Sequence, residues 1–79
     1  MFVAIVVEKV DSKFDVDLLS TEDEGWEFVR STITKYCLRF DATLSTNLSF
    51  DEIVRHYKEK VDGLDTDLVW TVVELLVTL

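Results

Sequence analysis

The sequence predicts a small α+β domain with an N-terminal β-hairpin, two helices and a C-terminal strand. Three stretches carry this prediction: a β-branched run at the start, a capped amphipathic stretch after residue 49, and an alternating apolar run at the end. A chain of 79 residues has room for one hydrophobic core, so we expect a single domain over residues 1–79. The expected sheet is antiparallel or mixed, and both helices are expected to cover one face of it.

The first two strands are predicted over residues 2–10 and 14–20. The run FVAIVVEKV is almost continuously apolar and β-branched, which favours a strand at the centre of a sheet or one covered on both faces. The segment between the strands supports a hairpin, although without an Asn-Gly or Asp-Gly pair it indicates no particular turn type. The second strand has the alternation of a half-solvated strand, with Phe14, Val16 and Leu18 set against Asp15, Asp17 and Leu19.

A first helix is expected to begin after Ser20 or Thr21, because either side chain can cap it and an acidic residue follows three positions later. Three carboxylates would then lie at the positive end of the helix dipole. The helical stripe that would be buried consists of Trp26, Val29, Ile33, Tyr36 and Phe40.

The end of this helix is ambiguous in the sequence. From Lys35 onward, KYCLRFDATLS alternates apolar and polar residues as a strand does, and the threonines around Ile33 lower helix propensity. We therefore predict a helix to about Thr34 followed by a middle strand, with a continued helix over residues 35–45 as the alternative.

The second helix has the clearest boundaries. Ser49 and Glu52 form the pattern of a capping box, and Gly63 is a suitable left-handed stop. Its expected inner face is Phe50, Ile53, Val54, Tyr57 and Val61, and its expected outer face is Glu52, Arg55, His56, Glu59 and Lys60.

The C-terminal run DLVWTVVELLVTL is predicted to be a strand, because half of its residues from Leu68 are Val or Thr; a helix capped by Asp65 or Asp67 is the alternative. Both faces of this strand would be largely apolar, and the helices can cover only one. A second copy or a partner should therefore meet part of Leu68, Trp70, Val72 and Leu76, or else the opposite set, Val69, Thr71, Val73, Leu75, Val77 and Leu79.

Composition excludes several classes of function. A formal net charge of −8 disfavours direct binding to nucleic acid or anionic lipid, whereas it favours encounter with a basic protein surface. The apolar stretch after Asp67 is shorter than the roughly 20 residues of a bilayer span and contains Glu74. The single cysteine, Cys37, excludes an intrachain disulfide framework, so we expect a cytoplasmic protein.

No catalytic constellation is evident, so we expect no enzyme activity, no metal and no cofactor. The only histidine, His56, is expected on a solvated helix face, and Cys37 carries no signature of an activated thiolate. Two glycines are too few for a phosphate-binding loop. Two aspartate clusters resemble cation sites only in composition and are interpreted as solvated turns: Asp11, Asp15 and Asp17, and Asp62, Asp65 and Asp67.

The sequence feature most suggestive of function is an acidic belt of Asp11, Asp15, Asp17, Glu22, Asp23, Glu24 and Glu27, expected to gather at one end of the molecule. Our leading hypothesis is a non-catalytic interaction protein that docks on a basic surface of another protein, as inhibitors and regulators from phages and mobile elements do. The alternatives are a homodimer formed through an apolar sheet face or edge, and a metal-dependent enzyme using paired aspartates. Acidity that serves solubility alone is the simplest competing interpretation of the belt.

Overall fold

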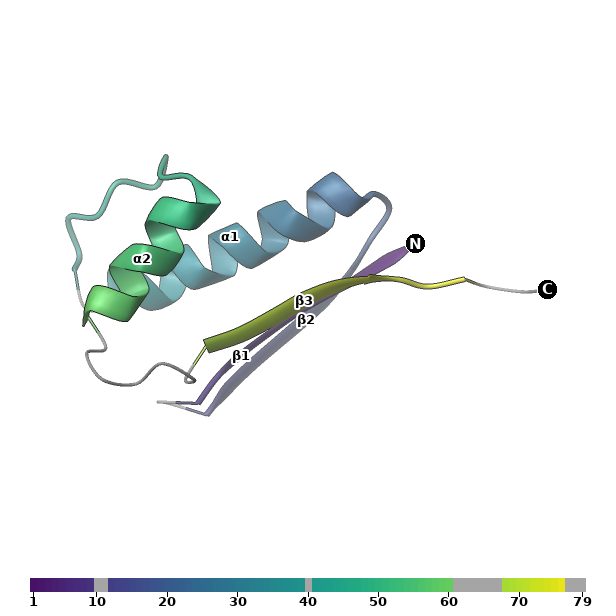
Figure 1. Cartoon of the computed structure of the whole chain (residues 1–79), viewed down its shortest axis with the longest axis horizontal. Helices are drawn as coiled ribbons and strands as arrows, with labels where there is room; N and C mark the ends of the chain where they lie inside the picture. Colours follow the sequence, from purple (N-terminus) through teal and green to yellow (C-terminus); the bar gives the residue numbers. More distant parts are fainter. Residues whose placement is uncertain (10–11, 40, 61–67, 77–79) are drawn as a thin grey trace.

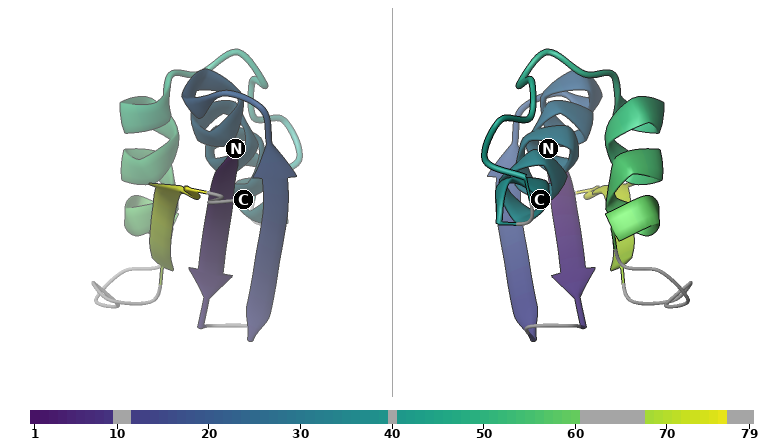
Figure 2. Two further views of the ribbon diagram at one scale, coloured as in Figure 1. Left: turned by 90° about the vertical axis from the view of Figure 1, so that its right-hand side faces the viewer. Right: turned by 90° about the vertical axis from the view of Figure 1, so that its left-hand side faces the viewer.

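The computed structural model describes residues 1–9, 12–39, 41–60 and 68–76 and confirms the α+β prediction. Three strands form one antiparallel sheet in the order β2-β1-β3. Figures 1 and 2 show both helices on the same side of this sheet. In chain order the elements are β1 (Phe2–Glu8), β2 (Lys13–Leu19), α1 (Glu22–Leu38), α2 (Phe50–Lys60) and β3 (Leu68–Glu74).

The central strand, β1, pairs along its whole length with both neighbours, as its continuous β-branched run predicts. Its side chains alternate in burial because successive residues of a strand point to opposite faces. Ala4, Val6 and Glu8 face the helices and are fully buried. The residues between them are only partly buried, since their face of the sheet carries no layer of described residues.

Helix α1 begins where the sequence predicts. The Thr21 side chain accepts a hydrogen bond from the amide of Glu24 at 3.2 Å, and its hydroxyl donates to the Glu24 carboxylate at 3.0 Å. This reciprocal pair satisfies one of the first-turn amides that an uncapped helix leaves unbonded.

The prediction of a middle strand after Thr34 is wrong, because α1 continues to Leu38 and the described residues that follow are turns and loop. Tyr36 and Cys37 extend the buried stripe by another turn, so tertiary packing overrides the local alternation. The hydroxyl of Thr34 donates to the carbonyl of Arg30 at 2.8 Å, which accommodates this residue within the helix. Phe40 lies outside the described residues.

Helix α2 has the predicted capping box. The Ser49 hydroxyl donates to the Glu52 carboxylate at 2.8 Å, and the amides of Ser49 and Glu52 each bond to the other residue's side chain at 3.3 Å. Of the predicted inner face, Ile53 and Tyr57 are buried, whereas Phe50 and Val54 are partly buried. Val61 and Gly63 fall outside the described residues.

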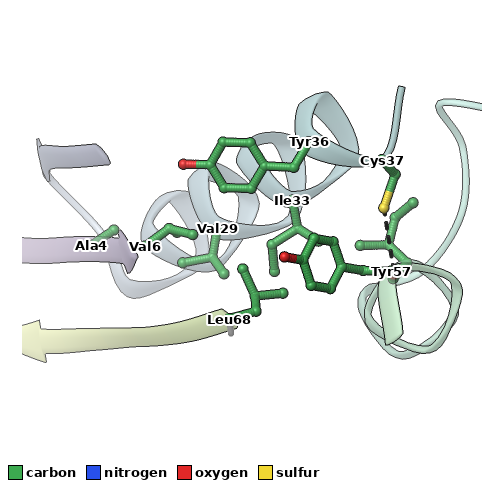
Figure 3. Close-up of a cluster of buried hydrophobic side chains, with 9 residues drawn as sticks. Ala4, Val6, Val29, Ile33, Tyr36, Cys37, Tyr57 and Leu68 are labelled. Atoms are coloured by element: carbon green, nitrogen blue, oxygen red, sulfur yellow. Dashed lines mark hydrogen bonds between the residues drawn. The ribbon is translucent and has the colours of Figure 1, made fainter. Parts of the chain in front are cut away.

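The hydrophobic core lies between α1, α2 and the helix side of the sheet (Figure 3). Helix α1 packs against all three strands and against α2, so it lies between α2 and much of the sheet. The core residues are Ala4, Val6, Val29, Ile33, Tyr36, Cys37, Ile53, Tyr57 and Leu68.

Gly25 sets the distance between the first half of α1 and β3. An added Cβ at this position would lie 2.8 Å from Cγ1 of Val72, closer than side chains pack. The absence of a side chain therefore permits the helix to lie directly on the outer strand.

The Gly25→Ala variant should be destabilised, although alanine is the better helix former by about 1 kcal/mol. Forcing a methyl group against the stiff Val72 side chain costs about 1–3 kcal/mol in a packed core, so we expect a net loss of roughly 1–2 kcal/mol in urea denaturation. In a Val72→Ala background the same change should instead stabilise. An increase in stability in both backgrounds would contradict the close approach.

Candidate functional site: an open apolar sheet face

The face of the sheet turned away from the helices is almost entirely apolar. Residues directly opposite each other on neighbouring antiparallel strands lie on the same face, so the register defines its members. They form three rows that cross β2, β1 and β3 in turn: Leu18, Val3 and Val73; Val16, Ile5 and Thr71; Phe14, Val7 and Val69. We call these nine residues the open face.

The open face is exposed as well as apolar. Its three positions on the central strand are partly buried by their neighbours, and the outer positions protrude. The exposed fractions are 66% for Phe14, 56% for Leu18, 49% for Val69, and 47% for both Val16 and Val73. At roughly 100–150 Å² for a fully exposed Val or Leu side chain and somewhat more for Phe, these five residues present roughly 300–400 Å², the size of the largest apolar patch on a typical monomer.

Strand β2 has its polarity reversed relative to an ordinary strand beneath helices. In such a strand the apolar residues face the helices and the polar residues face water. Here Asp15 shares the helix side with its buried partner Val6, whereas Phe14, Val16 and Leu18 point away from the helices. The alternation in the sequence is therefore present in the strand, but its apolar residues lie on the side that the described helices do not cover.

Two carboxylates on the helix side of the sheet have hydrogen-bond partners from the end of α1. The hydroxyl of Tyr36 donates to the carboxylate of Asp15, and burial of Tyr36, reinforced by this bond, raises its pKa above the usual value. Arg39 donates to the carboxylate of Glu8, which is fully buried at the end of β1. These bonds lower the cost of placing carboxylates under a helix.

The structure does not gather the described part of the predicted acidic belt at one end. Asp15 bonds to Tyr36 in the last turns of α1, whereas Glu22 lies in the first turn, about 20 Å away along the helix. The carboxylate of Asp17 accepts a hydrogen bond from the amide of Leu18 at 2.9 Å. Glu22, Asp23, Glu24 and Glu27 do lie together, at the start of α1, and Asp11 lies outside the described residues.

An aromatic seam adjoins this acidic start of α1. Trp26 meets Phe50 edge to face at a centroid distance of 5.8 Å, and Phe50 meets Trp70 in the same way at 5.3 Å. Trp26, predicted to be buried, is 39% exposed and lines a hollow of about 430 Å³ with Asp23, Glu27, Arg30 and Phe50. Arg30 bonds to Glu27, which lowers the pKa of that carboxyl.

The predicted self-association residues of β3 lie on the helix side. Leu68 is buried in the core, Trp70 packs on Phe50, and Val72 packs beneath Gly25. Leu76 follows the end of the strand and is 86% exposed. Of the opposite set, Val69, Thr71 and Val73 belong to the open face, and Val77 and Leu79 lie outside the described residues.

Cys37 and His56, the two residues considered for catalysis in the sequence, are both removed from full solvent exposure. Cys37 is fully buried, and burial raises the pKa of its thiol to about 11. His56, expected in solvent, is half-buried, with Nε2 3.7 Å from an Asp41 carboxylate oxygen. Within the described ranges no three side chains of the metal-ligating types come together, and the aspartates after residue 60 fall outside those ranges.

Neither described helix combines the length and the apolar character that a membrane span requires. Comparison of the chain with protein-family models, with curated protein sequences and with solved structures gives no match.

Sequence reasoning missed the open face as a unit and the Glu8–Arg39 pair. The first requires knowledge of which side of the sheet the helices cover, and that choice is not encoded in the alternation of a strand. The second joins residues 31 positions apart, and the only local signal is a carboxylate within a run of core residues. A charged residue embedded in an apolar strand usually marks a buried partner elsewhere in the chain.

The Arg39→Ala variant should lose roughly 2–4 kcal/mol of stability, because it removes the guanidinium that pairs with the fully buried Glu8 carboxylate. Urea denaturation measures this loss. As a matched control, Arg55→Ala on the exposed side of α2 should change stability by less than about 0.5 kcal/mol. Adding Glu8→Leu to an Arg39→Met variant should recover much of the loss. Equal effects at positions 39 and 55 would show that the pair is unimportant.

Proposed function

We propose that this protein is a protein-interaction module that binds another polypeptide chain through its open face. The observation that carries the proposal is the nine-residue face itself, eight residues of which are apolar and none charged. A contiguous exposed apolar patch of several hundred Å² often serves a function, and protein–protein contact is one such function.

The composition of β2 strengthens the proposal. A strand selected only for solubility would place its aspartates outward and its apolar residues under the helix. This strand does the opposite, and the half-buried Asp15 accepts a hydrogen bond from Tyr36 of α1 that offsets part of the cost of its desolvation. Such an arrangement is understandable if both sides of the strand become buried in the working assembly.

A second candidate surface, for a basic polypeptide, is favoured by the hollow beside Trp26. The carboxylate of Asp23 lines this hollow beside the Glu27–Arg30 ion pair, and Glu22 accepts a hydrogen bond from the indole Nε1 of Trp26 at 3.4 Å. An exposed indole among carboxylates suits a lysine or arginine side chain, which can contact the ring face and the acids together.

Replacing the three apolar residues of β2 on the open face, Phe14, Val16 and Leu18, by threonine should abolish capture of partner chains by a tagged bait. Threonine retains high strand propensity and approximates valine in shape, so the bait should stay folded by circular dichroism. Captured proteins, including untagged copies of the chain itself, would be compared by mass spectrometry.

The matched control for this capture replaces three exposed α2 residues, Asp51, Lys58 and Glu59, by alanine. This control should capture the same proteins as the wild type. Capture of an identical set by the threonine variant would refute docking through the open face.

Reversing two charges beside Trp26, with Glu22→Lys and Asp23→Lys, tests the second candidate. Binding to an immobilised arginine-rich peptide should weaken by about tenfold or more and should depend less on salt. The control carries Asp51→Lys and Glu59→Lys, the same change in net charge on α2. Equal weakening by both pairs would attribute binding to net charge and remove the Trp26 surface from the account.

A further inference from the structure

We infer that the occupant of the open face is a second copy of this chain, stacked sheet against sheet about a two-fold axis that passes near Ile5. This inference rests on the proposed function, because it names the partner of the same surface. The resulting dimer has four layers, with the helices of each copy on the outside and two three-stranded sheets about 10 Å apart in the middle.

Self-complementarity is the first argument. In a two-fold interface the same patch serves both partners, so any charge on it meets a like charge near the axis. The open face carries no charge although 30% of the chain is charged, and its single polar residue is Thr71. Rows of Val, Ile, Leu and Phe can pack against identical rows without a buried polar group, so the Thr71 hydroxyl is the one side-chain polar group of the face to be accommodated.

The placement of the carboxylates supplies the second argument. Each copy has a formal charge of −8, which opposes association unless the charges are kept apart. The acidic side chains of the strands, Glu8, Asp15, Asp17 and Glu74, all share the helix side of the sheet by register. The acidic start of α1 lies on that side as well, so stacking through the open face directs these carboxylates outward.

The apolar area available for burial determines how far the two open faces must overlap. A specific interface needs about 1,000 Å² in total. The five apolar residues on the outer strands contribute roughly 300–400 Å² per copy, so the total for both copies approaches that threshold only if the β1 positions and Thr71 also contribute and the faces overlap fully. Full overlap of three rows on three strands places the middle residue, Ile5, opposite its own copy.

Pairing through the edge of β2 is the competing arrangement, and one contact argues against it. The amide of Leu18 donates to the carboxylate of Asp17 at 2.9 Å, so a side chain already occupies one backbone donor of this edge strand. Charged side chains at Lys13, Asp15 and Asp17 also line the strand, which is how natural edge strands resist pairing.

Sedimentation equilibrium of the purified chain at micromolar concentration tests the inference. The expected mass is twice the 9.1 kDa of one copy, unchanged in high salt, because the contact is uncharged. Val16→Lys should give a folded monomer, since a lysine in the middle row would be buried without a partner. Ala42→Lys, the same change of charge at an exposed loop position, should stay dimeric.

A cysteine placed at the centre of the face distinguishes stacking from edge pairing. The Ile5→Cys chain should be cross-linked to a covalent dimer by a bifunctional methanethiosulfonate with a span of about 5 Å, because two thiols that face each other from sheets about 10 Å apart lie closer than the backbones. The wild-type chain provides the background, because its Cys37 is fully buried and has a raised pKa. An Ala42→Cys chain should remain uncross-linked under the same conditions.

The outcomes separate this inference from the proposed function. A wild-type monomer, or a dimer that Val16→Lys leaves intact, overturns the stacked dimer. If the chain is monomeric while capture of other proteins still requires Phe14, Val16 and Leu18, the open face remains an interaction surface and its occupant is a different protein. A monomer whose capture is also insensitive to those residues overturns both.

Discussion

The packing of α1 along the central strand β1 is the contact on which the rest of the structure depends. It brings Val29 and Ile33 onto Ala4 and Val6, all of them fully buried, and every other element is attached through one of these two. Strands β2 and β3 pair with β1, and α2 rests on α1. An 11-residue helix is marginal on its own in water, so α2 depends on its packing against α1 and on the contact of Phe50 with Trp70 of β3. The small residues Ala4 and Gly25 permit the helix to approach the sheet closely.

One consequence is that all the helical cover of the described chain is committed to a single face. A second α1-like layer would require residues that the described segments do not contain, so the three strands are left half covered. The distribution of polar and apolar side chains between the two faces of the sheet is unusual. Carboxylates with hydrogen-bond partners, at Glu8 and Asp15, lie beneath the helices, and unpartnered apolar side chains lie outside. Placing the carboxylates there demands specific donors, Arg39 and Tyr36, both from the last turns of α1 or directly after it.

The sequence predicts the parts of this fold that depend on local chemistry. Thr21 and Ser49 cap helices because their side chains bond amides within three residues, and the strand runs are visible from β-branched content. Prediction from the sequence fails where a contact between distant parts of the chain determines the local structure. The alternation after Lys35 is as good a strand pattern as any, and only the burial of Tyr36 and Cys37 against other elements keeps that segment helical. The acidic belt is the sequence feature most suggestive of function, but its described residues do not lie together. Strand β2 and helix α1 run in opposite directions, so Asp15 lies far from Glu22.

The same limit explains why the sequence shows that both faces of the C-terminal strand are apolar, but not which face the helices cover. Its two faces, Leu68, Trp70 and Val72 against Val69, Thr71 and Val73, are nearly equal in hydrophobicity, so only the position of the helices breaks the symmetry. In β2 the two faces are unequal, and the more apolar one is the face without helices. Reversing β2 would place Phe14, Val16 and Leu18 on the helix side, where Asp15 and Leu19 are now partly buried, and would turn the aspartates toward the open face. In the proposed dimer a second copy covers the open face, so the polarity of β2 would add apolar residues to a core that is small in a chain of 79 residues.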